Sequence, residues 1–405
     1  MKPKNKIALQ VVFCGGLAFF CSFIDRLAWP PVIPVAAKEL GLNGAQAGGF
    51  MSAFFLGYLL TQLPGGILAD RLGTRKVLLF SLVIMGLFTL LMSQAQDFSS
   101  GILLRFFAGL GSGGVLAAAV KGVYDYFEPR YRATAMGFLM ASGPLGLLTA
   151  NLAAPVLAAR LGWRYSFVFA GLFTLLSWLM ARQLLPAHQS SPTLPPSFQK
   201  SQRQEFWAFL ANKQLIITAA AGFFAMWGTW GTLTWANAYM HQGLGLSLQQ
   251  SGQAMALFAL GALMGQPLVG WISDQFPRKR RQTGMIILGL FSVLLWLFGN
   301  NQEVKNLLFL TPLLGAGAFI FGPVLNTYIS ELMEGHQVAT AIGFCNGIWQ
   351  LGSLISPVAA GALLDYTGYY SWAFAVLAAG PMIAVFLLAT VGAITKKRGL
   401  EEDLT

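Results

Sequence analysis

The sequence predicts an all-α membrane protein whose twelve transmembrane helices form two six-helix bundles of similar structure. Three observations lead to this prediction. Of the 405 residues, 56% are hydrophobic and 10% are charged, whereas soluble domains carry about 25% charged residues. The apolar residues gather in runs long enough to cross a bilayer, and the second half of the chain repeats the pattern of the first.

Each apolar run has the length of one membrane-spanning helix. Such a helix needs about 20 apolar residues to cross roughly 30 Å of hydrocarbon. Helices are predicted rather than barrel strands because the runs are too long for strands and lipid offers the backbone no other partner. The twelve runs lie at about 8–37, 46–69, 77–96, 100–127, 133–158, 165–185, 214–240, 248–273, 284–302, 306–330, 337–364 and 369–395.

The lysines and arginines predict the orientation of these helices. They concentrate before the first run, in every second loop and after the last run, while the opposite loops carry few, such as Lys38 and Lys305. Positively charged loops stay in the cytoplasm, so both termini are expected there, in a bacterial inner membrane. This orientation explains the net charge of +11, and no nucleic-acid partner is expected.

A sequence repeat divides the chain into two halves. The stretch "QAGGFMSAFFLGYLLTQLPGGILAD" begins at Gln46, and "QSGQAMALFALGALMGQPLVGWISD" begins 204 residues later at Gln250. Between the halves, 186–213 carries prolines, serines and glutamines, which predicts a cytoplasmic linker between an N-terminal bundle at 1–185 and a C-terminal bundle at 214–405. Parallel repeats of this kind are typical of carriers that rock about a binding site near the bilayer midplane, at the interface of the repeats.

Several classes of function are not expected. Cys14, Cys21 and Cys345 lie inside apolar runs without CxxC spacing, which argues against disulfides and a metal site. No GxxxxGK[ST] phosphate loop occurs, so nucleotide hydrolysis is not expected to drive the protein. Neither a cofactor, a metal nor an enzymatic activity is predicted.

The loop "GGILADRLGTRK" at residues 65–76 places an acid and three cations between the second and third runs. Its glycines permit a tight turn and close helix contact. The stretch resembles the loop signature of the major facilitator superfamily, G-x-L-a-D-r-x-G-r-[KR]. The resemblance implies a cluster that clasps the two halves while the binding site faces outward; the alternative is that the cations only set orientation. The implied gating residues are Gly66, Asp70, Arg71, Gly73, Arg75, Lys76 and, in the weaker copy "GWISDQFPRKRR", Asp274.

Further stretches resemble the same superfamily over essentially the whole chain. They include "RFFAGLGSGG" in the fourth run and "LGWRYSFVFAG" at the start of the sixth. Within the superfamily, the chain is most similar to the anion:cation symporters, through "FIDRLAWPPVIPVAAKELGL", "SAFFLGYLLTQLPGGILADRLG" and the motif around Arg105. The resemblance implies a monomeric carrier that moves a small organic anion, a carboxylate or sugar acid, by alternating access and proton-coupled symport.

Three charged residues, Asp25, Arg26 and Arg105, lie deep within runs of the first half. A charge at mid-bilayer costs at least ~2.5–3.5 kcal/mol, and residues that bear this cost are usually functional. At 1.5 Å per residue, Arg26 and Tyr58 lie about 18 Å and Arg105 about 12 Å from the outer loops. Two guanidiniums and a phenol at comparable depth predict a site for a carboxylate or phosphate. The alternative is a structural ion network of the three charged residues.

Asp25 is the predicted proton-coupling residue, although the arginines and burial act on its proton affinity in opposite directions. The anion symporters commonly carry a glutamate seven residues after the arginine of the fourth run, and this chain has Ser112 there. Ser112 faces the same cavity as Arg105 but cannot exchange a proton. Coupling therefore rests on Asp25 alone, or the protein exchanges anions, or it is a uniporter. Lys121 is expected to pair with Asp125, one helical turn away.

The second half is expected to complete the site with uncharged groups. Trp227 and Trp230 lie deep in the seventh run, while Asn346 and Gln350 share one face of the eleventh because they are one turn apart. The alternative to substrate binding for each of these residues is a contact between helices, because polar amides also hold membrane helices together. The predicted substrate-binding residues are Arg26, Tyr58, Arg105, Ser112, Trp227, Trp230, Asn346 and Gln350.

Two other functions remain open on the sequence alone. The stretch "SGPLG" at Ser142 matches part of an antiporter signature, which would suit proton-driven efflux of drugs or metabolites. The fourth run and the second half lack the buried acid that would favour export of a cation. A membrane receptor without transport activity is disfavoured because the sequence contains no soluble signalling domain.

Overall fold

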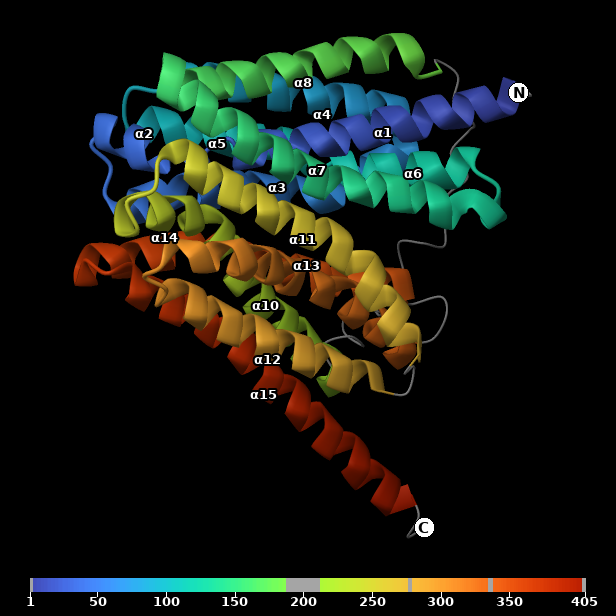
Figure 1. The fold of residues 1–405 in the computed structure, drawn as a ribbon. Coiled ribbons are helices and arrows are strands. Elements are labelled where there is room, and N and C mark those ends of the chain that lie inside the picture. The colour runs from blue at the N-terminus through green and yellow to red at the C-terminus, as the bar shows by residue number, and fades with distance from the viewer. Residues whose placement is uncertain (1–2, 187–211, 276–278, 334–337, 403–405) are drawn as a thin grey trace. The chain divides into compact units, whose positions relative to one another are not determined.

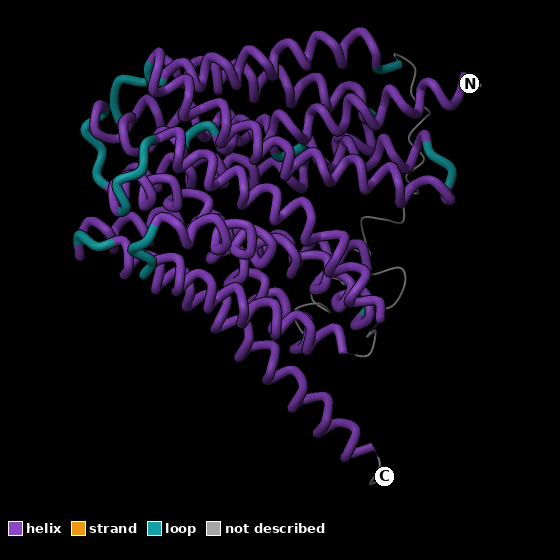
Figure 2. Tube along the Cα trace, viewed as in Figure 1, coloured by secondary structure: helices purple, strands orange, loops and turns teal. Residues whose placement is uncertain are grey.

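The computed structural model describes residues 3–186, 212–275, 279–333 and 338–402. Within these ranges the chain is almost entirely helical, with short loops between the helices (Figure 2). Twelve helical segments of the described residues are long and apolar enough to cross a membrane. The predicted fold class and number of membrane-spanning helices are confirmed.

The chain separates into two compact units. The first contains Met1–Leu194 together with Leu233–Leu260, and the second contains Pro195–Thr232 together with Gly261–Thr405. The predicted bundles at 1–185 and 214–405 share most of their residues with these units, but their boundaries stay a prediction. The predicted linker at 186–213 lies almost entirely outside the described residues.

The first unit holds the first six membrane-spanning segments and parts of two later helices (Figure 1). Within it, α3 packs on α5, α4 on α8 and α1 on α7. Its helices are α1 (Pro3–Leu27), η1 (Pro30–Val32), α2 (Ile33–Glu39), α3 (Gly44–Leu72), α4 (Thr74–Leu91), η2 (Met92–Gln94), α5 (Phe98–Ser112), α6 (Val115–Tyr126), α7 (Pro129–Leu161) and α8 (Arg164–Leu184), with the end of α10 (Lys213–Ala238), the π-turn η3 (Tyr239–Gly243) and the first part of α11 (Leu248–Gln275).

Prolines interrupt the first membrane-spanning segment between α1 and α2. Pro30 and Pro31 have no N–H group and fix the backbone φ angle, so a regular α-helix cannot continue through them. The carbonyl of Trp29 instead accepts hydrogen bonds from the N–H groups of Val32 and Ile33, at 3.0 and 3.1 Å. Peptide carbonyls at the end of α1 therefore need donors from elsewhere.

Glycines bring α3 and α5 into close contact. A Cβ atom at Gly57 would collide with the carbonyl oxygen of Phe106, and one at Gly109 would collide with the carbonyl oxygen of Phe54. Such small-residue contacts let membrane helices approach backbone to backbone. The position of α5 against α3 therefore depends on these two glycines.

The fourth membrane-spanning segment is interrupted at Gly113 and Gly114, between α5 and α6. The hydroxyl of Thr61 in α3 donates a hydrogen bond of 2.9 Å to the carbonyl of Leu110, which lies four residues before Gly114. The side chain from the neighbouring helix thus supplies a donor at the interruption, as a break inside a membrane requires.

The second unit repeats this packing with different residues. The ninth segment packs on the twelfth, α12 on α15, as the third packs on the sixth in the first unit. Gly261 lies so close to α13 that a Cβ atom would collide with the carbonyl oxygen of Pro312. The helices of this unit are the first part of α10, the second part of α11, α12 (Arg280–Gly299), η5 (Val304–Asn306), α13 (Leu307–Leu332), α14 (Val338–Thr367) and α15 (Tyr370–Glu402).

The sequence repeat is also visible at two helix starts. At α3, Asn43 and Gln46 exchange hydrogen bonds of side chain to backbone at 2.8 and 3.1 Å. At α11, Ser247 and Gln250 do the same at 3.1 and 2.9 Å. These are capping boxes, which satisfy free N–H groups at a helix start, and they lie at equivalent positions of the two repeats.

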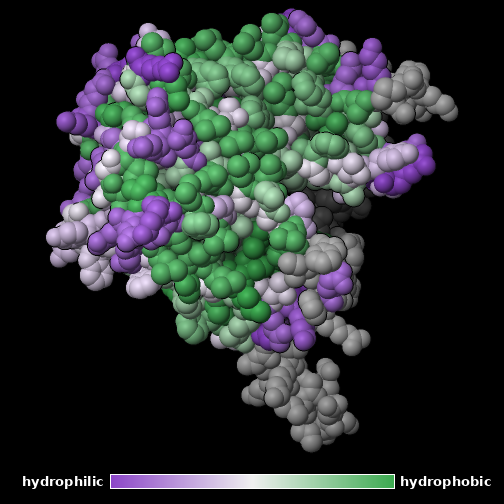
Figure 3. Space-filling view, viewed as in Figure 1, coloured by the Kyte–Doolittle hydropathy of each residue, from purple (hydrophilic) through white to green (hydrophobic). Residues whose placement is uncertain are grey.

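Large apolar side chains cover the lateral surface of the helices. Leu63, Phe80 and Phe138 are each about two-thirds exposed or more, at 74%, 65% and 71%. In Figure 3, hydrophobic residues cover the middle of the helices, and hydrophilic residues gather at their ends. Continuous apolar surface of this extent is unusual for a soluble protein and suits contact with lipid.

Candidate functional site

The buried charges of the first unit gather where α1 ends. Asp25, Arg26 and Arg105 are 0%, 3% and 1% exposed. Tyr58 of α3 is also buried and lies beside Arg26. The structure thus brings together the four residues of the first half that the sequence placed at similar depth.

Arg105 of α5 binds the peptide backbone. Its guanidinium donates hydrogen bonds to the carbonyls of Asp25, Arg26 and Phe50, at 2.8, 2.9 and 3.3 Å. The carbonyl of Arg26 has no helical donor because Pro30, four residues later, lacks an N–H group. Arg105 therefore stabilises the end of α1 against α3 and α5, through carbonyls rather than carboxylates.

Arg26 lies among aromatic rings. Its guanidinium carbon is 4.7 Å from the ring centre of Tyr58 and 5.2 to 5.3 Å from those of Phe23, Phe54 and Phe55. Cation–π attraction stabilises a guanidinium in such a setting while the rings keep water away. The guanidinium of Arg26 is thus enclosed by side chains of α1 and α3.

One ring separates the two guanidiniums. The ring of Phe54 is 4.8 Å from Arg105 and 5.3 Å from Arg26. The phenylalanines of this cluster could not be singled out from the sequence, because an apolar segment contains many aromatic residues. The sequence offered one signal, the spacing of Phe54 and Tyr58, which are one helical turn apart.

Asp25 points to a different side of α1 from Arg26. Both of its carboxylate oxygens lie 3.1 Å from the hydroxyl of Thr174 in α8, which donates to them. One helical turn away, Cys21 donates to the hydroxyl of Ser177, also in α8. Asp25 is therefore enclosed between α1 and α8, and Thr174 is a partner that the sequence analysis did not identify.

Ser112 is fully buried at the end of α5. Its hydroxyl lies 2.6 Å from the hydroxyl of Ser22 in α1. This contact joins α5 to α1 one turn before Asp25. The position at which related symporters carry a glutamate is here a neutral hydroxyl pair, so it cannot take up a proton.

A layer of aromatic residues lies beyond Arg105 towards the ends of the helices. Trp29 packs against Phe50, Trp163 and Phe167, with ring centres 4.8, 6.4 and 6.4 Å away. The indole of Trp29 also donates to the carbonyl of Ala47 at 2.8 Å. The layer closes this end of the first unit and shields the guanidinium of Arg105.

An ion pair joins three segments at the same end of the first unit. Arg164 at the start of α8 pairs with Glu39 of α2 and donates to the carbonyl of Ala95 at 3.0 Å. The indole of Trp163 donates to the other carboxylate oxygen of Glu39, at 2.9 Å. The cation thus connects the ends of the first, third and sixth membrane-spanning segments.

The predicted gating loop turns at Gly73, whose φ angle of 85° is a conformation that glycine adopts without strain. Arg75 donates to the carbonyl of Arg182 at the end of α8, at 2.8 Å. Asp70, Arg71 and Lys76 are exposed, and Gly66 is partly buried.

The side chain of Asp274 in the second copy of the loop lies outside the described residues. The gating role of the loop stays a prediction. The expected pair of Lys121 and Asp125 is confirmed, with Nζ 3.0 Å from the carboxylate.

In the second unit, Asn346 and Gln350 of α14 contact each other, with the amide of Gln350 donating to the carbonyl oxygen of Asn346 at 3.3 Å. Trp227 of α10 instead donates its indole N–H to the carbonyl of Val376 in α15, at 3.1 Å. Trp230 is 4% exposed. Their role as substrate contacts stays a prediction.

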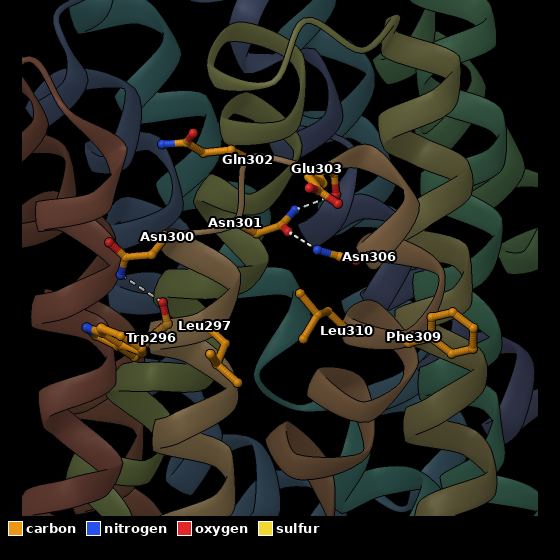
Figure 4. Close-up of a pocket in the computed structure, with 9 residues that line it drawn as sticks. All are labelled: Trp296, Leu297, Asn300, Asn301, Gln302, Glu303, Asn306, Phe309 and Leu310. Atoms are coloured by element: carbon orange, nitrogen blue, oxygen red, sulfur yellow. Dashed lines mark hydrogen bonds between the residues drawn. The ribbon is translucent and has the colours of Figure 1, made fainter.

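A separate pocket of about 640 Å³ lies between α12 and α13 (Figure 4). Amides that line the pocket form hydrogen bonds within the connection between the two helices. Asn306 donates to Asn301 at 3.0 Å, and Asn301 donates to the carbonyl of Glu303 at 2.9 Å. Trp296 and Phe309 form its apolar rim. It contains none of the predicted site residues.

The profile of the Major Facilitator Superfamily matches residues 15–310 and 283–403. The chain belongs to this superfamily. It is 27% identical to a probable sulfoacetate transporter of Cupriavidus necator, over 98% of each chain. It is 26% identical to a hexuronate transporter of Bacillus subtilis over 94% of this chain and 93% of that one, and 27% identical to a cis,cis-muconate transport protein of Acinetobacter baylyi over 88% and 87%.

Solved structures share the fold. A bacterial homolog of the human lysosomal transporter Spinster, in an inward-facing and unoccupied conformation, has a TM-score of 0.77 at 19% identity, over 97% of this chain and 96% of that one. A mutant of the nucleoside transporter NupG has a TM-score of 0.80 at 13% identity, over 94% and 99%. These structures agree in fold with the family match and the named relatives, which make the chain a multi-pass membrane transporter of this superfamily and not an enzyme, as the sequence predicted.

Proposed function

We propose that this major facilitator transporter is a secondary carrier of a small organic anion and that Arg26 binds the anionic group. The observation that carries the proposal is the buried guanidinium of Arg26 within 4.7–5.3 Å of four aromatic ring centres. A guanidinium offers paired donors to a carboxylate, and their attraction is stronger where water is excluded. The substrates named for the relatives, sulfoacetate, hexuronate and muconate, are anions and support the proposal.

Arg105 acts in this proposal as a positioning residue. Its donors bind the carbonyls of Asp25 and Arg26, so it holds the end of α1 and thereby the backbone of Arg26. Tyr58 borders the same guanidinium. Ser112 acts through Ser22, as a contact between helices.

Proton coupling is proposed to rest on Asp25. Ser112 carries no titratable group, so Asp25 is the acid available beside Arg26. Its carboxylate contacts Thr174 of α8, while its carbonyl contacts Arg105 of α5. A change of charge at Asp25 therefore acts on the same helix end that positions Arg26. We also propose that both termini lie in the cytoplasm, because the distribution of lysine and arginine favours this orientation. The proposed monomeric state and bacterial inner membrane follow from the family resemblance.

The substrate class is tested by thermal stability of the purified protein. The panel contains hexuronate, gluconate, hexanoate, a short sulfonate and the lipophilic cation tetraphenylphosphonium. At least one anion is expected to raise the melting temperature of the wild type. Arg26→Gln is expected to lower the affinity for that anion about 100-fold, because charge-assisted hydrogen bonds contribute about 1.5–3 kcal/mol each.

Arg130→Gln is the matched control for this substitution, since Arg130 is an exposed arginine paired with Glu128. It is expected to bind like the wild type. Stabilisation by tetraphenylphosphonium and by none of the anions would favour efflux of cations and contradict the proposal.

The coupling is tested in proteoliposomes with the anion that binds. One proton moving down ~150 mV supplies about 3.5 kcal/mol, enough for roughly 300-fold accumulation. Asp25→Asn is expected to abolish accumulation driven by a proton gradient while exchange of internal for external anion continues. If the variant still accumulates anion, coupling does not pass through Asp25.

A further inference from the structure

The pocket between α12 and α13 (the α12–α13 pocket) lies at the same place in its repeat as a smaller pocket of the first unit. The smaller pocket, of about 300 Å³, is lined by residues that include Gln94, Gln96 and Arg164. The α12–α13 pocket, of about 640 Å³, is lined by residues that include Asn300 and Gln302. The two pairs of turn residues are 206 positions apart, so both pockets occupy the turn between the third and fourth spans of a repeat.

An arginine lines the pocket of the first unit. Arg164 is the first residue of α8, and the chain turns into this helix at Gly162, whose φ angle is 104°. Its guanidinium donates to the carbonyl of Ala95 at 3.0 Å and pairs with Glu39. A cation of the protein itself thus binds a carbonyl of this turn.

The equivalent position of the second unit is a tyrosine. Tyr370 is the first residue of α15, and the chain turns into this helix at Gly368, whose φ angle is 73°. These two residues follow Arg164 and Gly162 by 206 positions. Tyrosine is uncharged at neutral pH, and the described residues that line the α12–α13 pocket include no lysine or arginine. The larger pocket can therefore take a cation from another molecule.

The α12–α13 pocket is polar at one end and apolar at the other. Figure 4 shows Gln302 and Glu303 at one end and Trp296 and Phe309 towards the other. Trp296 is 53% exposed and Phe309 is 73% exposed. Since α12 begins at Arg280 and has 20 residues, it is about 30 Å long, which is the thickness of the hydrocarbon layer. The pocket at its far end therefore lies where lipid headgroups meet acyl chains.

The charges at the polar end are complementary to a zwitterionic headgroup. Glu303 lines the pocket and pairs with Lys305 at 2.8 Å. An ammonium group can bind the carboxylate of Glu303 while a phosphate binds Lys305, and both contacts are charge-assisted. Carboxylate and amide oxygens accept hydrogen bonds, so a primary ammonium with three N–H donors suits them. A quaternary ammonium has no such donor.

We propose that the α12–α13 pocket binds phosphatidylethanolamine from the surrounding membrane. Its ammonium group takes the role that Arg164 has in the first unit and contacts Glu303, its phosphate contacts Lys305, and its acyl chains cover Trp296 and Phe309. The lipid thereby supports the turn between α12 and α13 from outside the chain. This site is independent of the transported substrate and of the anion contact proposed for Arg26.

The test measures lipid preference by native mass spectrometry. Delipidated protein in detergent receives equal amounts of dioleoyl phosphatidylethanolamine and dioleoyl phosphatidylcholine, which differ in the N–H donors of the headgroup. The wild type is expected to bind the first about tenfold more tightly, because only this lipid makes charge-assisted hydrogen bonds from its ammonium group. Glu303→Gln is expected to reduce the preference to about twofold or less.

Glu128→Gln is the matched control for this substitution. Glu128 is also an exposed glutamate in an ion pair with a nearby basic residue, Arg130, but it belongs to the first unit. This variant is expected to keep the tenfold preference. The difference between the two variants separates the α12–α13 pocket from other lipid contacts of the protein.

Tyr370→Arg gives the second unit the cation of the first. Its guanidinium is expected to bind the turn as Arg164 does and to exclude the ammonium group. The variant should lose the preference for phosphatidylethanolamine, and its melting temperature without lipid should equal or exceed that of the wild type. Tyr370→Phe changes the same side chain without adding a charge and is expected to keep the preference.

Three results would overturn this proposal. The first is equal binding of the two lipids by the wild type. The second is an unchanged preference in both Glu303→Gln and Tyr370→Arg. The third is displacement of the lipid by glycerophosphoethanolamine, the headgroup without acyl chains, which would identify a site for a soluble amine. None of these results bears on anion binding at Arg26, which the thermal-stability panel tests separately.

Discussion

The two units share their helix packing but bury different kinds of polar group. The first unit encloses full charges at Asp25, Arg26 and Arg105. Within the described residues of the second unit, the buried polar side chains are hydroxyls and amides, such as those of Ser353 and Gln350. The same architecture thus supports an ionic interior in one unit and a neutral one in the other.

Each buried charge of the first unit has partners within that unit. Arg105 is held by three carbonyls, Arg26 by aromatic rings and Asp25 by Thr174. The reason is the size of the cost. An unpaired charge in a low-dielectric interior costs far more than an unpaired hydroxyl, so each of the three charges is held by groups of the protein itself.

The largest effect on stability is expected from removing the hydrogen bonds that Arg105 makes in the first unit. Arg105→Gln removes donors from the carbonyls of Asp25, Arg26 and Phe50, and each buried carbonyl left alone costs about 1–3 kcal/mol. The free energy of unfolding is expected to fall by about 3 kcal/mol or more, seen as a large drop in melting temperature in detergent. Arg130→Gln, the exposed control, should change little. An Arg105→Gln protein that melts like the wild type but no longer binds anion would identify Arg105 as a direct ligand instead.

A smaller effect tests the packing that the two units share. Gly57→Ala and Gly261→Ala each push a Cβ atom into a carbonyl oxygen of the neighbouring helix, and overpacking of this kind typically costs about 1–3 kcal/mol. Both variants are expected to melt at lower temperature by similar amounts. Gly137→Ala is the control, because its Cβ would meet nothing within 4 Å and alanine favours the helix. Clearly unequal drops in melting temperature for the two variants would show that the equivalent helix contacts do not contribute equally to stability in the two units.

The smallest effect concerns a helix start that has a charged cap in only one unit. Asp97 caps α5 by accepting from Ser100 at 2.7 Å, whereas the start of α13 at Asn306 has no side-chain cap. The backbone and side-chain hydrogen bonds from Ser100 lower the pKa of Asp97 below its ordinary value. The stabilisation is therefore present at neutral pH and is lost as the pH falls below about 4 through the lowered pKa.

Asp97→Asn is accordingly expected to melt slightly below the wild type at pH 7 and to show a weaker decline towards pH 3. Asn306→Ala should leave both values almost unchanged. Melting curves between pH 7 and pH 3 measure both variants. A wild type and an Asp97→Asn variant with parallel pH dependence would contradict this role of the carboxylate.

Much of the fold follows from the sequence because the membrane imposes strong constraints. Apolar runs must be helices, and the offset between Gln46 and Gln250 reappears as equivalent capping boxes in the structure. The pair of Lys121 and Asp125 was predicted because spacing along one helix determines it. The candidate site could be predicted only in part. Arg26, Tyr58 and Arg105 were placed at similar depth, but depth does not say which way a side chain points.

The sequence by itself determined the helical membrane fold, the twelve spans, the repeat and the identity of the few charges inside the bilayer, because hydrophobicity and helix length act locally along the chain. Only the tertiary structure decided what each charge contacts. It turned Arg105 onto carbonyls at the end of α1, including the Arg26 carbonyl that Pro30 leaves without a helical donor. It also enclosed Arg26 among rings from α1 and α3, and set Asp25 against Thr174. Those contacts come from residues far apart in the sequence, and a buried charge takes whichever partner the packing of neighbouring helices brings within reach.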